Sequence, residues 1–206
     1  MSDNEATKLV PVLNVPNILT MIRLAAVPVL AVMLLTHPHD VTWRFASTMV
    51  FIAAIITDAF DGNIARKYGL VTNWGKIWDS VADKAITGVA WIGLSWVGEI
   101  PWWITIVILG REWGITYMRA RMLKYGVMAA RKGGKIKTVV QSLAIPLFMI
   151  VIPGIGIWFT SVRWGLLLCA LVLTVATGVD YVFEAKRLKA AAIAAGGPVD
   201  ANGKLL

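Results

Sequence analysis

Long apolar stretches alternate with short polar connections along almost the whole of this chain. Each stretch is close to the ~20 residues that a helix needs to cross a hydrocarbon core about 30 Å thick. Helices are the expected structure, because a lipid-exposed backbone must satisfy its own hydrogen bonds. The pattern predicts an all-α membrane protein with six transmembrane helices. The expected spans are residues 16–36, 43–60, 77–97, 101–122, 138–158 and 164–185.

The composition agrees with this pattern and excludes an ordinary soluble domain. Hydrophobic residues fill 58% of the 206 positions and charged residues only 16%, and the mean hydropathy is +0.71. Such values are typical of a polytopic membrane protein. We expect a cytoplasmic segment at 1–15, one six-helix transmembrane catalytic domain at 16–189 and a flexible tail at 190–206.

The basic residues determine the expected orientation of the chain. The formal net charge is +8, and most of the Lys and Arg residues lie in the connections 61–76 and 119–137 and near the two termini. The positive-inside rule therefore places both termini and the 61–76 connection in the cytoplasm. Because the charge lies at predicted helix ends, it favours anionic lipid and phosphate ligands over nucleic acid.

Four carboxylates lie beside the second and third apolar stretches. Asp58 and Asp61 are three residues apart, and Asp79 and Asp83 are four apart, so each pair shares one face of a helix. Two consecutive antiparallel helices would bring the pairs to the same depth. Four anions repel one another unless a cation joins them, and oxygen ligands favour Mg²⁺, Mn²⁺ or Ca²⁺. The spacing predicts one or two divalent ions engaged in phosphoryl chemistry.

Small residues and one arginine accompany the carboxylates. Gly62, Ala65 and Gly75 keep the surrounding space open for a ligand or a neighbouring helix. Arg66 supplies a guanidinium that suits a phosphate oxygen. The alternative, unrelated charges at a membrane interface, does not predict four Asp at helical spacing with small residues between them.

The segment that contains these residues carries a family resemblance. Residues 58–83, DAFDGNIARKYGLVTNWGKIWDSVAD, match the pattern D-x2-D-G-x2-A-R-x8-G-x3-D-x3-D at every fixed position. This pattern resembles the signature of the CDP-alcohol phosphotransferase family. The resemblance implies a six-helix bundle of that type with a cytoplasm-facing active site. It also implies transfer of a phosphoalcohol from a CDP-linked donor to an alcohol, with release of CMP.

The resemblance implies a role for each residue of the motif. Asp58, Asp61 and Asp79 would hold two divalent ions, Mg²⁺ or Mn²⁺, with Asp83 touching the second ion. Asp83 would also be the general base that takes the proton of the acceptor hydroxyl. Spacing alone does not choose between Asp79 and Asp83 as the base. The remaining contacts, to the CDP part of the donor, would come from Gly62, Arg66 and Thr72.

The first apolar stretch opens with NVPNILTMIR at residues 14–23. Pro16 favours a helix start, and Asn17, Thr20 and Arg23 recur near one face. One interpretation is a plain helix start with Arg23 reaching to the membrane interface. In the resembling family this segment walls the nucleotide pocket, so we expect Asn17 and Thr20 to contact the donor.

Cations in the fourth and fifth stretches indicate a second anion site. Arg111 lies midway along the fourth stretch and Arg119 about two turns later, while Lys135 and Lys137 open the fifth. A buried Arg111–Glu112 ion pair and a plain positive-inside cluster remain alternatives. The segments REWGIT and GKIKTVVQ resemble the bacterial glycerol 3-phosphate branch of the family. This resemblance implies that Arg111, Lys135 and Lys137 grip the phosphate of the acceptor, with Arg119 extending the positive charge.

Taken together, the resemblance implies an enzyme of phospholipid biosynthesis in the bacterial inner membrane. Its partners would be CDP-diacylglycerol, glycerol 3-phosphate, membrane lipid and a second copy of the chain in a homodimer. Three alternatives stay open. Inositol phosphate could be the acceptor, the acidic residues could serve a divalent-cation transporter, or the chain could be an inactive lipid-binding or scaffold relative.

Overall fold

The structure is a computed structural model that describes residues 14–67, 72–126, 132–154, 156–194 and 197. At 61–67, 73, 76, 132–133 and 135 it describes the backbone alone. The chain divides into two compact units. The first unit contains residues up to Val97 together with Met149–Val151, and the second contains Gly98–Phe148 and the residues from Ile152 onward.

The described part of the chain contains helices and no strand, which confirms the all-helical prediction. Within the described residues, three segments are long and apolar enough to cross a membrane: Val15–Thr36, Val41–Phe60 and Ile157–Ala194. The helices are α1 (Val15–Thr36), α2 (Val41–Lys67), α3 (Asn73–Trp96), α4 (Trp102–Met122), the short 3₁₀ helix η1 (Leu123–Tyr125), α5 (Lys132–Met149) and α6 (Ile157–Ala194).

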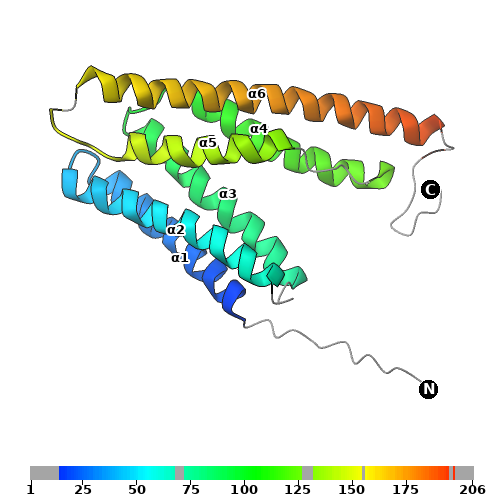
Figure 1. The fold of residues 1–206 in the computed structure, drawn as a ribbon, viewed down its shortest axis with the longest axis horizontal. Helices are drawn as coiled ribbons and strands as arrows, with labels where there is room; N and C mark the ends of the chain where they lie inside the picture. Colours follow the sequence, from blue (N-terminus) through cyan, green and yellow to red (C-terminus); the bar gives the residue numbers. More distant parts are fainter. Residues whose placement is uncertain (1–13, 68–71, 127–131, 155, 195–196, 198–206) are drawn as a thin grey trace. The chain divides into compact units, whose positions relative to one another are not determined.

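In the first unit, α1 packs against both α2 and α3 (Figure 1). Leu30 and Leu34 of α1, Phe51 of α2 and Ile86 of α3 are fully buried between them. A Cβ atom placed on Gly93 would lie 2.9 Å from the side chain of Leu34, so glycine at this position lets α1 and α3 approach closely. This close packing positions α2 and α3, which carry the acidic residues, around α1.

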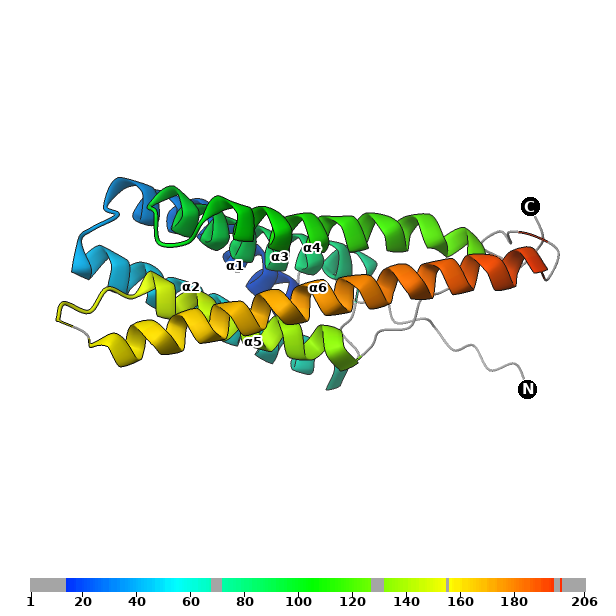
Figure 2. The same ribbon diagram turned by 90° about the horizontal axis from the view of Figure 1, so that it is seen from above.

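In the second unit, α4 packs against α6. Helix α5 runs beside α6 in both views of the ribbon (Figures 1 and 2). The amide Nε2 of Gln141 donates a 2.8 Å hydrogen bond to Oγ1 of Thr174, and both side chains are buried. A polar pair of this kind holds adjacent helices in register where lipid offers no alternative partner.

The boundary between α5 and α6 differs from the prediction. The sequence predicts spans at 138–158 and 164–185, whereas α5 ends at Met149 and α6 runs from Ile157 to Ala194. Pro153 disfavours helical conformation in the residue before it, and Gly154 adopts a positive φ of 73°. The apolar pattern runs through this turn without interruption, so hydrophobicity alone hides the break.

Arg44 stabilises one end of the first unit. This α2 arginine is only 1% exposed, and its Nε donates to the carbonyl oxygen of Met149 at 2.6 Å. Its Nη1 donates to the carbonyl oxygen of Pro38 at 3.0 Å. The first bond satisfies a carbonyl at the C-terminal end of α5, where no further intrahelical donor is available.

Replacing Arg44 with leucine is expected to destabilise the protein, because two carbonyls would lose charged donors. The expected loss is about 1.5–3 kcal/mol, or roughly 3–12 °C in Tm for a chain of this size. Thermal unfolding of the purified protein in detergent measures the shift. The matched control is Arg187→Leu at an exposed position on α6, and an Arg44→Leu protein that melts with this control would contradict the assignment.

Candidate active site

The acidic residues of α2 and α3 meet at an arginine of α1. Nη1 of Arg23 donates to Oδ1 of Asp58 at 2.5 Å and to Oδ1 of Asp79 at 2.9 Å. Two carboxylates from different helices therefore share one guanidinium nitrogen. The arginine side chain is 1% exposed, whereas those of Asp58 and Asp79 are 36% and 44% exposed. A buried cation thus lies behind two carboxylates that remain accessible.

Asp83 follows Asp79 by one turn of α3 and is half-buried. The negative charges of both Asp79 and Asp83 act on Asp58, together with the positive charge of Arg23. Asp61 belongs to α2, but its side chain is outside the described part of the structure. Among the described side chains, no group of three His, Cys, Asp or Glu is arranged to hold a metal ion. The cluster of four carboxylates therefore stays a prediction. The structure shows one part of it, the approach of Asp58 and Asp79 to the same arginine.

The donor set of this pair fits a hard divalent cation. Two partly exposed carboxylates that converge on one point can supply the all-oxygen ligands that Mg²⁺ and Mn²⁺ prefer. The convergence has a local cause: α1 is packed against both α2 and α3, so each of those helices presents its acidic face to Arg23. One interpretation of the sequence had Arg23 reaching to the membrane interface, but the side chain is buried and pairs with Asp58 and Asp79 instead.

A polar network joins the starts of α1 and α3. Nδ2 of Asn17 donates to Oγ1 of Thr72 at 3.1 Å, and the same oxygen caps α3 by accepting from the backbone N–H of Gly75 at 2.9 Å. Asn14 caps α1 by accepting from the N–H of Asn17 at 3.0 Å. A Cβ atom on Gly75 would lie 2.3 Å from Oδ1 of Asn17. Glycine is therefore needed here for the approach of the two helix ends.

The residues predicted to bind the donor lie partly in this network. Asn17 and Thr72 contact each other directly, and Thr20 donates to the carbonyl oxygen of Pro16 within its own helix at 3.1 Å. Asn17 and Thr20 are each 4% exposed. The other two predicted donor contacts, Gly62 and Arg66, lie outside the residues described in full.

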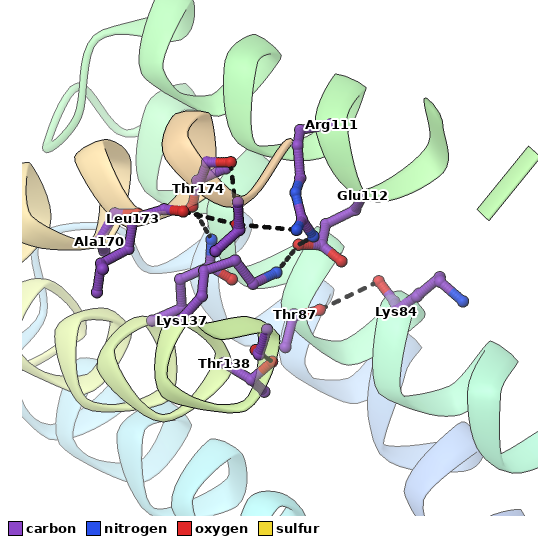
Figure 3. A network of polar contacts seen from close by, with 12 residues as sticks. Lys84, Thr87, Arg111, Glu112, Lys137, Thr138, Ala170, Leu173 and Thr174 are labelled. Atoms are coloured by element: carbon purple, nitrogen blue, oxygen red, sulfur yellow. Dashed lines mark hydrogen bonds and ion pairs between the residues drawn. The ribbon is translucent and has the colours of Figure 1, made fainter. Parts of the chain in front are cut away.

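In the second unit, two predicted acceptor residues converge on a glutamate (Figure 3). Nζ of Lys137 on α5 donates to Oε1 of Glu112 on α4. Nη1 of Arg111 lies 3.4 Å from the same oxygen, and Nη2 of Arg111 donates to Oγ1 of Thr177 on α6 at 2.9 Å. Lys137 is only 3% exposed. Glu112 is thus a common anchor for two cations that come from different helices.

Tyr181 of α6 brings two of the arginines of α4, Arg111 and Arg119, together. Nη2 of Arg119 donates to its hydroxyl at 2.5 Å. The guanidinium carbons of Arg119 and Arg111 lie 4.7 Å and 5.6 Å from the centre of its ring. These distances are typical of cation–π contacts, and the ring is 4% exposed. Tyr181 was not among the predicted site residues, because its position near Asp180 and Glu184 offers no distinguishing pattern.

Three cations gather in this group, since Arg111 and Lys137 contact the carboxylate of Glu112 and Arg119 contacts the hydroxyl of Tyr181. Arg111 also lines an open groove of about 550 Å³ between α4 and α6, whose other lining residues are mostly apolar. Such an arrangement suits a small anion, because guanidinium groups match phosphate oxygens. The side chain of Lys135, the fourth predicted acceptor residue, lies outside the described part of the chain.

A family model described as CDP-alcohol phosphatidyltransferase matches residues 13–176, which contain the complete acidic motif. The chain belongs to the CDP-alcohol phosphatidyltransferase family. This membership confirms the resemblance read from residues 58–83. The matched range contains both the Arg23–Asp58–Asp79 group and the cations of α4 and α5.

Curated members of the CDP-alcohol phosphatidyltransferase family are similar over most of the chain. A Mycobacterium tuberculosis (strain H37Rv) protein named probable phosphatidylglycerophosphate synthase is 44% identical over 175 residues, covering 84% of this chain and 82% of the relative. A Rickettsia typhi CDP-diacylglycerol–glycerol-3-phosphate 3-phosphatidyltransferase is 36% identical, covering 82% and 94%. The Bacillus subtilis protein of that name is 38% identical, covering 64% and 74%. The apolar helices and these bacterial relatives together identify an integral membrane protein.

Proposed function

We propose that this protein transfers the phosphatidyl group of CDP-diacylglycerol to sn-glycerol 3-phosphate, giving phosphatidylglycerol phosphate and CMP. The observation that carries the reaction class is the convergence of Asp58 and Asp79 inside a complete family motif. The named activities of the relatives support the choice of acceptor. The chain is therefore proposed to be a phosphatidylglycerophosphate synthase.

Divalent metal is typical of this family, and the acidic residues supply its ligands. We assign two ions, Mg²⁺ or Mn²⁺, to Asp58, Asp61, Asp79 and Asp83. When bound, they neutralise charge on the diphosphate and on the departing CMP. Asp83 takes the proton of the acceptor hydroxyl, whose oxygen attacks the phosphorus on the lipid side. The bond from this phosphorus to the CMP oxygen breaks, and CMP leaves.

The CDP part of the donor is assigned to the starts of α1 and α3 and to the motif. Asn17 and Thr72 already hold each other by a hydrogen bond, which orders both side chains before a ligand arrives. Thr20, Gly62 and Arg66 complete the proposed contacts. We assign Arg66 to a phosphate of the donor because its guanidinium can donate two parallel hydrogen bonds.

The phosphate of glycerol 3-phosphate is assigned to the cations Arg111, Lys135, Lys137 and Arg119. Glu112 and Tyr181 support this proposal because they order three of these cations through direct contacts. Side chains that are already ordered before the ligand binds lose less conformational freedom on binding. The acceptor alcohol itself contributes a neutral hydroxyl, so its phosphate is the group that cations can recognise.

The remaining proposals concern the membrane. We propose six transmembrane spans in one catalytic domain at 16–189, between a cytoplasmic segment at 1–15 and a flexible tail at 190–206. The active site and both termini face the cytoplasm of a bacterial inner membrane, as the distribution of Lys and Arg favours. We further propose that the protein is a homodimer.

Release of CMP tests the reaction class directly. Purified protein is incubated with CDP-diacylglycerol, and CMP is quantified with and without glycerol 3-phosphate, Mg²⁺ and EDTA. CMP should appear only when acceptor and metal are both present. Absence of CMP release under all conditions, with Mn²⁺ uptake into proteoliposomes that contain the protein, would instead support a cation transporter.

The acceptor proposal makes a separate kinetic prediction for Lys137. Lys137→Met is expected to raise the KM for glycerol 3-phosphate about 10–100-fold, because one charged hydrogen bond to phosphate contributes about 1.5–3 kcal/mol. The KM for CDP-diacylglycerol should remain within about twofold of the wild-type value. Lys124→Met, which removes a lysine lying over the ring of Tyr125, is the matched control. Equal acceptor KM values in the two variants would contradict the assignment.

A further inference from the structure

Arg23 occupies an unusual position for an arginine that pairs with carboxylates. The planar guanidinium commonly binds one carboxylate through two parallel hydrogen bonds. Here a single atom, Nη1, lies within 2.9 Å of one oxygen of Asp58 and one of Asp79. These two residues come from different helices, and the arginine side chain is 1% exposed. A buried positive charge is thus placed at the point where two proposed metal ligands converge.

A divalent ion held by Asp58 and Asp79 would draw on the same carboxylate charges that Arg23 now neutralises. A divalent ion and a guanidinium also repel each other strongly in a buried, low-dielectric place. We therefore expect the guanidinium to withdraw from at least one carboxylate when an ion is held there.

We propose that Arg23 is a displaceable internal cation that competes with the divalent ion for Asp58 and Asp79. This inference rests on the proposed function in one respect, the assignment of these carboxylates as metal ligands. Arg23 acts through the carboxylates and is a positioning residue. It holds the two acidic side chains together and stabilises their charges until a metal ion replaces it.

The competition has a consequence for the order of binding. After the guanidinium withdraws, its buried charge needs a compensating anion, and the diphosphate of the donor brings negative charge to the site. Metal alone should therefore bind weakly, and metal with donor should bind tightly. Coupling of this kind is reciprocal, so the metal must raise donor affinity by the same factor. An enzyme built this way takes up its ions mainly when the donor is present.

Direct Mn²⁺ binding tests the competition. Free Mn²⁺ is measured by electron paramagnetic resonance during titration of the purified full-length protein in detergent, without donor. Arg23→Met removes the charge and keeps an unbranched apolar side chain. It should bind Mn²⁺ at least about tenfold more tightly than the wild type, a change on the scale seen when groups around a metal site are altered. Unchanged or weaker binding by the folded variant would overturn the proposal, because Arg23 would then only orient the carboxylates.

Two further variants keep the test decisive. Arg23→Lys retains a positive charge but lacks the planar fork, so its Mn²⁺ affinity should lie between those of the wild type and Arg23→Met. If Arg23→Met fails to fold, Arg23→Lys decides the question, and wild-type or weaker affinity counts against the proposal. Arg163→Met is the matched control, since it removes an arginine that pairs with Glu99 at 3.2 Å. Its Mn²⁺ affinity should equal that of the wild type.

The same titration separates this inference from the proposed function. If wild-type protein binds Mn²⁺ with donor present and loses it in Asp58→Asn, the metal assignment holds whatever the Arg23 variants show. Adding CDP-diacylglycerol should tighten Mn²⁺ binding more in the wild type than in Arg23→Met. If wild-type protein binds no Mn²⁺ even with the donor, the metal assignment and the inference both fail.

Discussion

Asp83→Asn is expected to reduce kcat by about 10²–10⁴-fold while leaving donor binding nearly intact. An amide cannot take the proton of the acceptor hydroxyl, and loss of a general base costs about 10²–10⁴-fold. The size and hydrogen-bonding capacity of the side chain are nearly unchanged, so CDP-diacylglycerol should still bind. Steady-state CMP release gives kcat, and calorimetric titration gives the donor affinity.

The control for Asp83 is the same substitution at Asp180, an exposed residue of α6. Asp180→Asn should release CMP at the wild-type rate. Turnover by Asp83→Asn at that rate would reassign the base, and Asp79, one turn earlier on α3, is the alternative that the motif leaves open. Joint loss of donor binding and turnover would show that Asp83 acts mainly as a metal ligand.

Asp58→Asn is expected to lose both turnover and metal response. The substitution removes one of the two negative charges that converge at Arg23. Metal-based stabilisation of a phosphoryl transfer is worth several kcal/mol, which corresponds to roughly 10³-fold in rate. We also expect the Mg²⁺ concentration for half-maximal activity to rise. A Mg²⁺ titration of CMP release measures both effects.

Asp40→Asn is the matched control on the same helix. Oδ1 of Asp40 accepts from the backbone N–H groups of Thr42 and Trp43 at the start of α2. Asparagine caps a helix as well as aspartate does, so this variant should keep the wild-type Mg²⁺ response. An Asp58→Asn enzyme whose activity and Mg²⁺ titration match those of Asp40→Asn would remove Asp58 from the metal site.

The sequence predicted the helices best where polar residues mark their ends. The expected span 16–36 agrees with α1 to within one residue, since Asn14 and Pro16 mark its start and His37-Pro38 its end. Span 101–122 agrees with α4 in the same way. The join of α5 and α6 was misplaced because apolar residues continue through the turn around Pro153. Helix α2 was expected to end near residue 60, but it continues to Lys67 and so carries Asp61 as well.

The acidic motif could be read from the sequence because its information is local. Helical spacing places the carboxylates on one face of each helix, and the family pattern adds their roles. The role of Arg23 could not be read in this way, because an arginine in an apolar stretch can reach the membrane interface or a buried anion. Only the packing of α1 on α2 and α3 distinguishes the two. Tyr181 was missed for the same reason, since its cation partners lie about 60 residues earlier in the chain.

An acceptor-competition assay tests whether the protein transfers the phosphatidyl group to glycerol 3-phosphate. Purified protein, Mg²⁺ and CDP-diacylglycerol labelled in the phosphatidyl group are mixed with glycerol 3-phosphate and inositol phosphate at equal concentrations, and the labelled lipids are separated. We expect the label in phosphatidylglycerol phosphate, with equimolar CMP. Label only in the inositol product would contradict the proposed acceptor, and no labelled product with either acceptor would contradict the transferase itself.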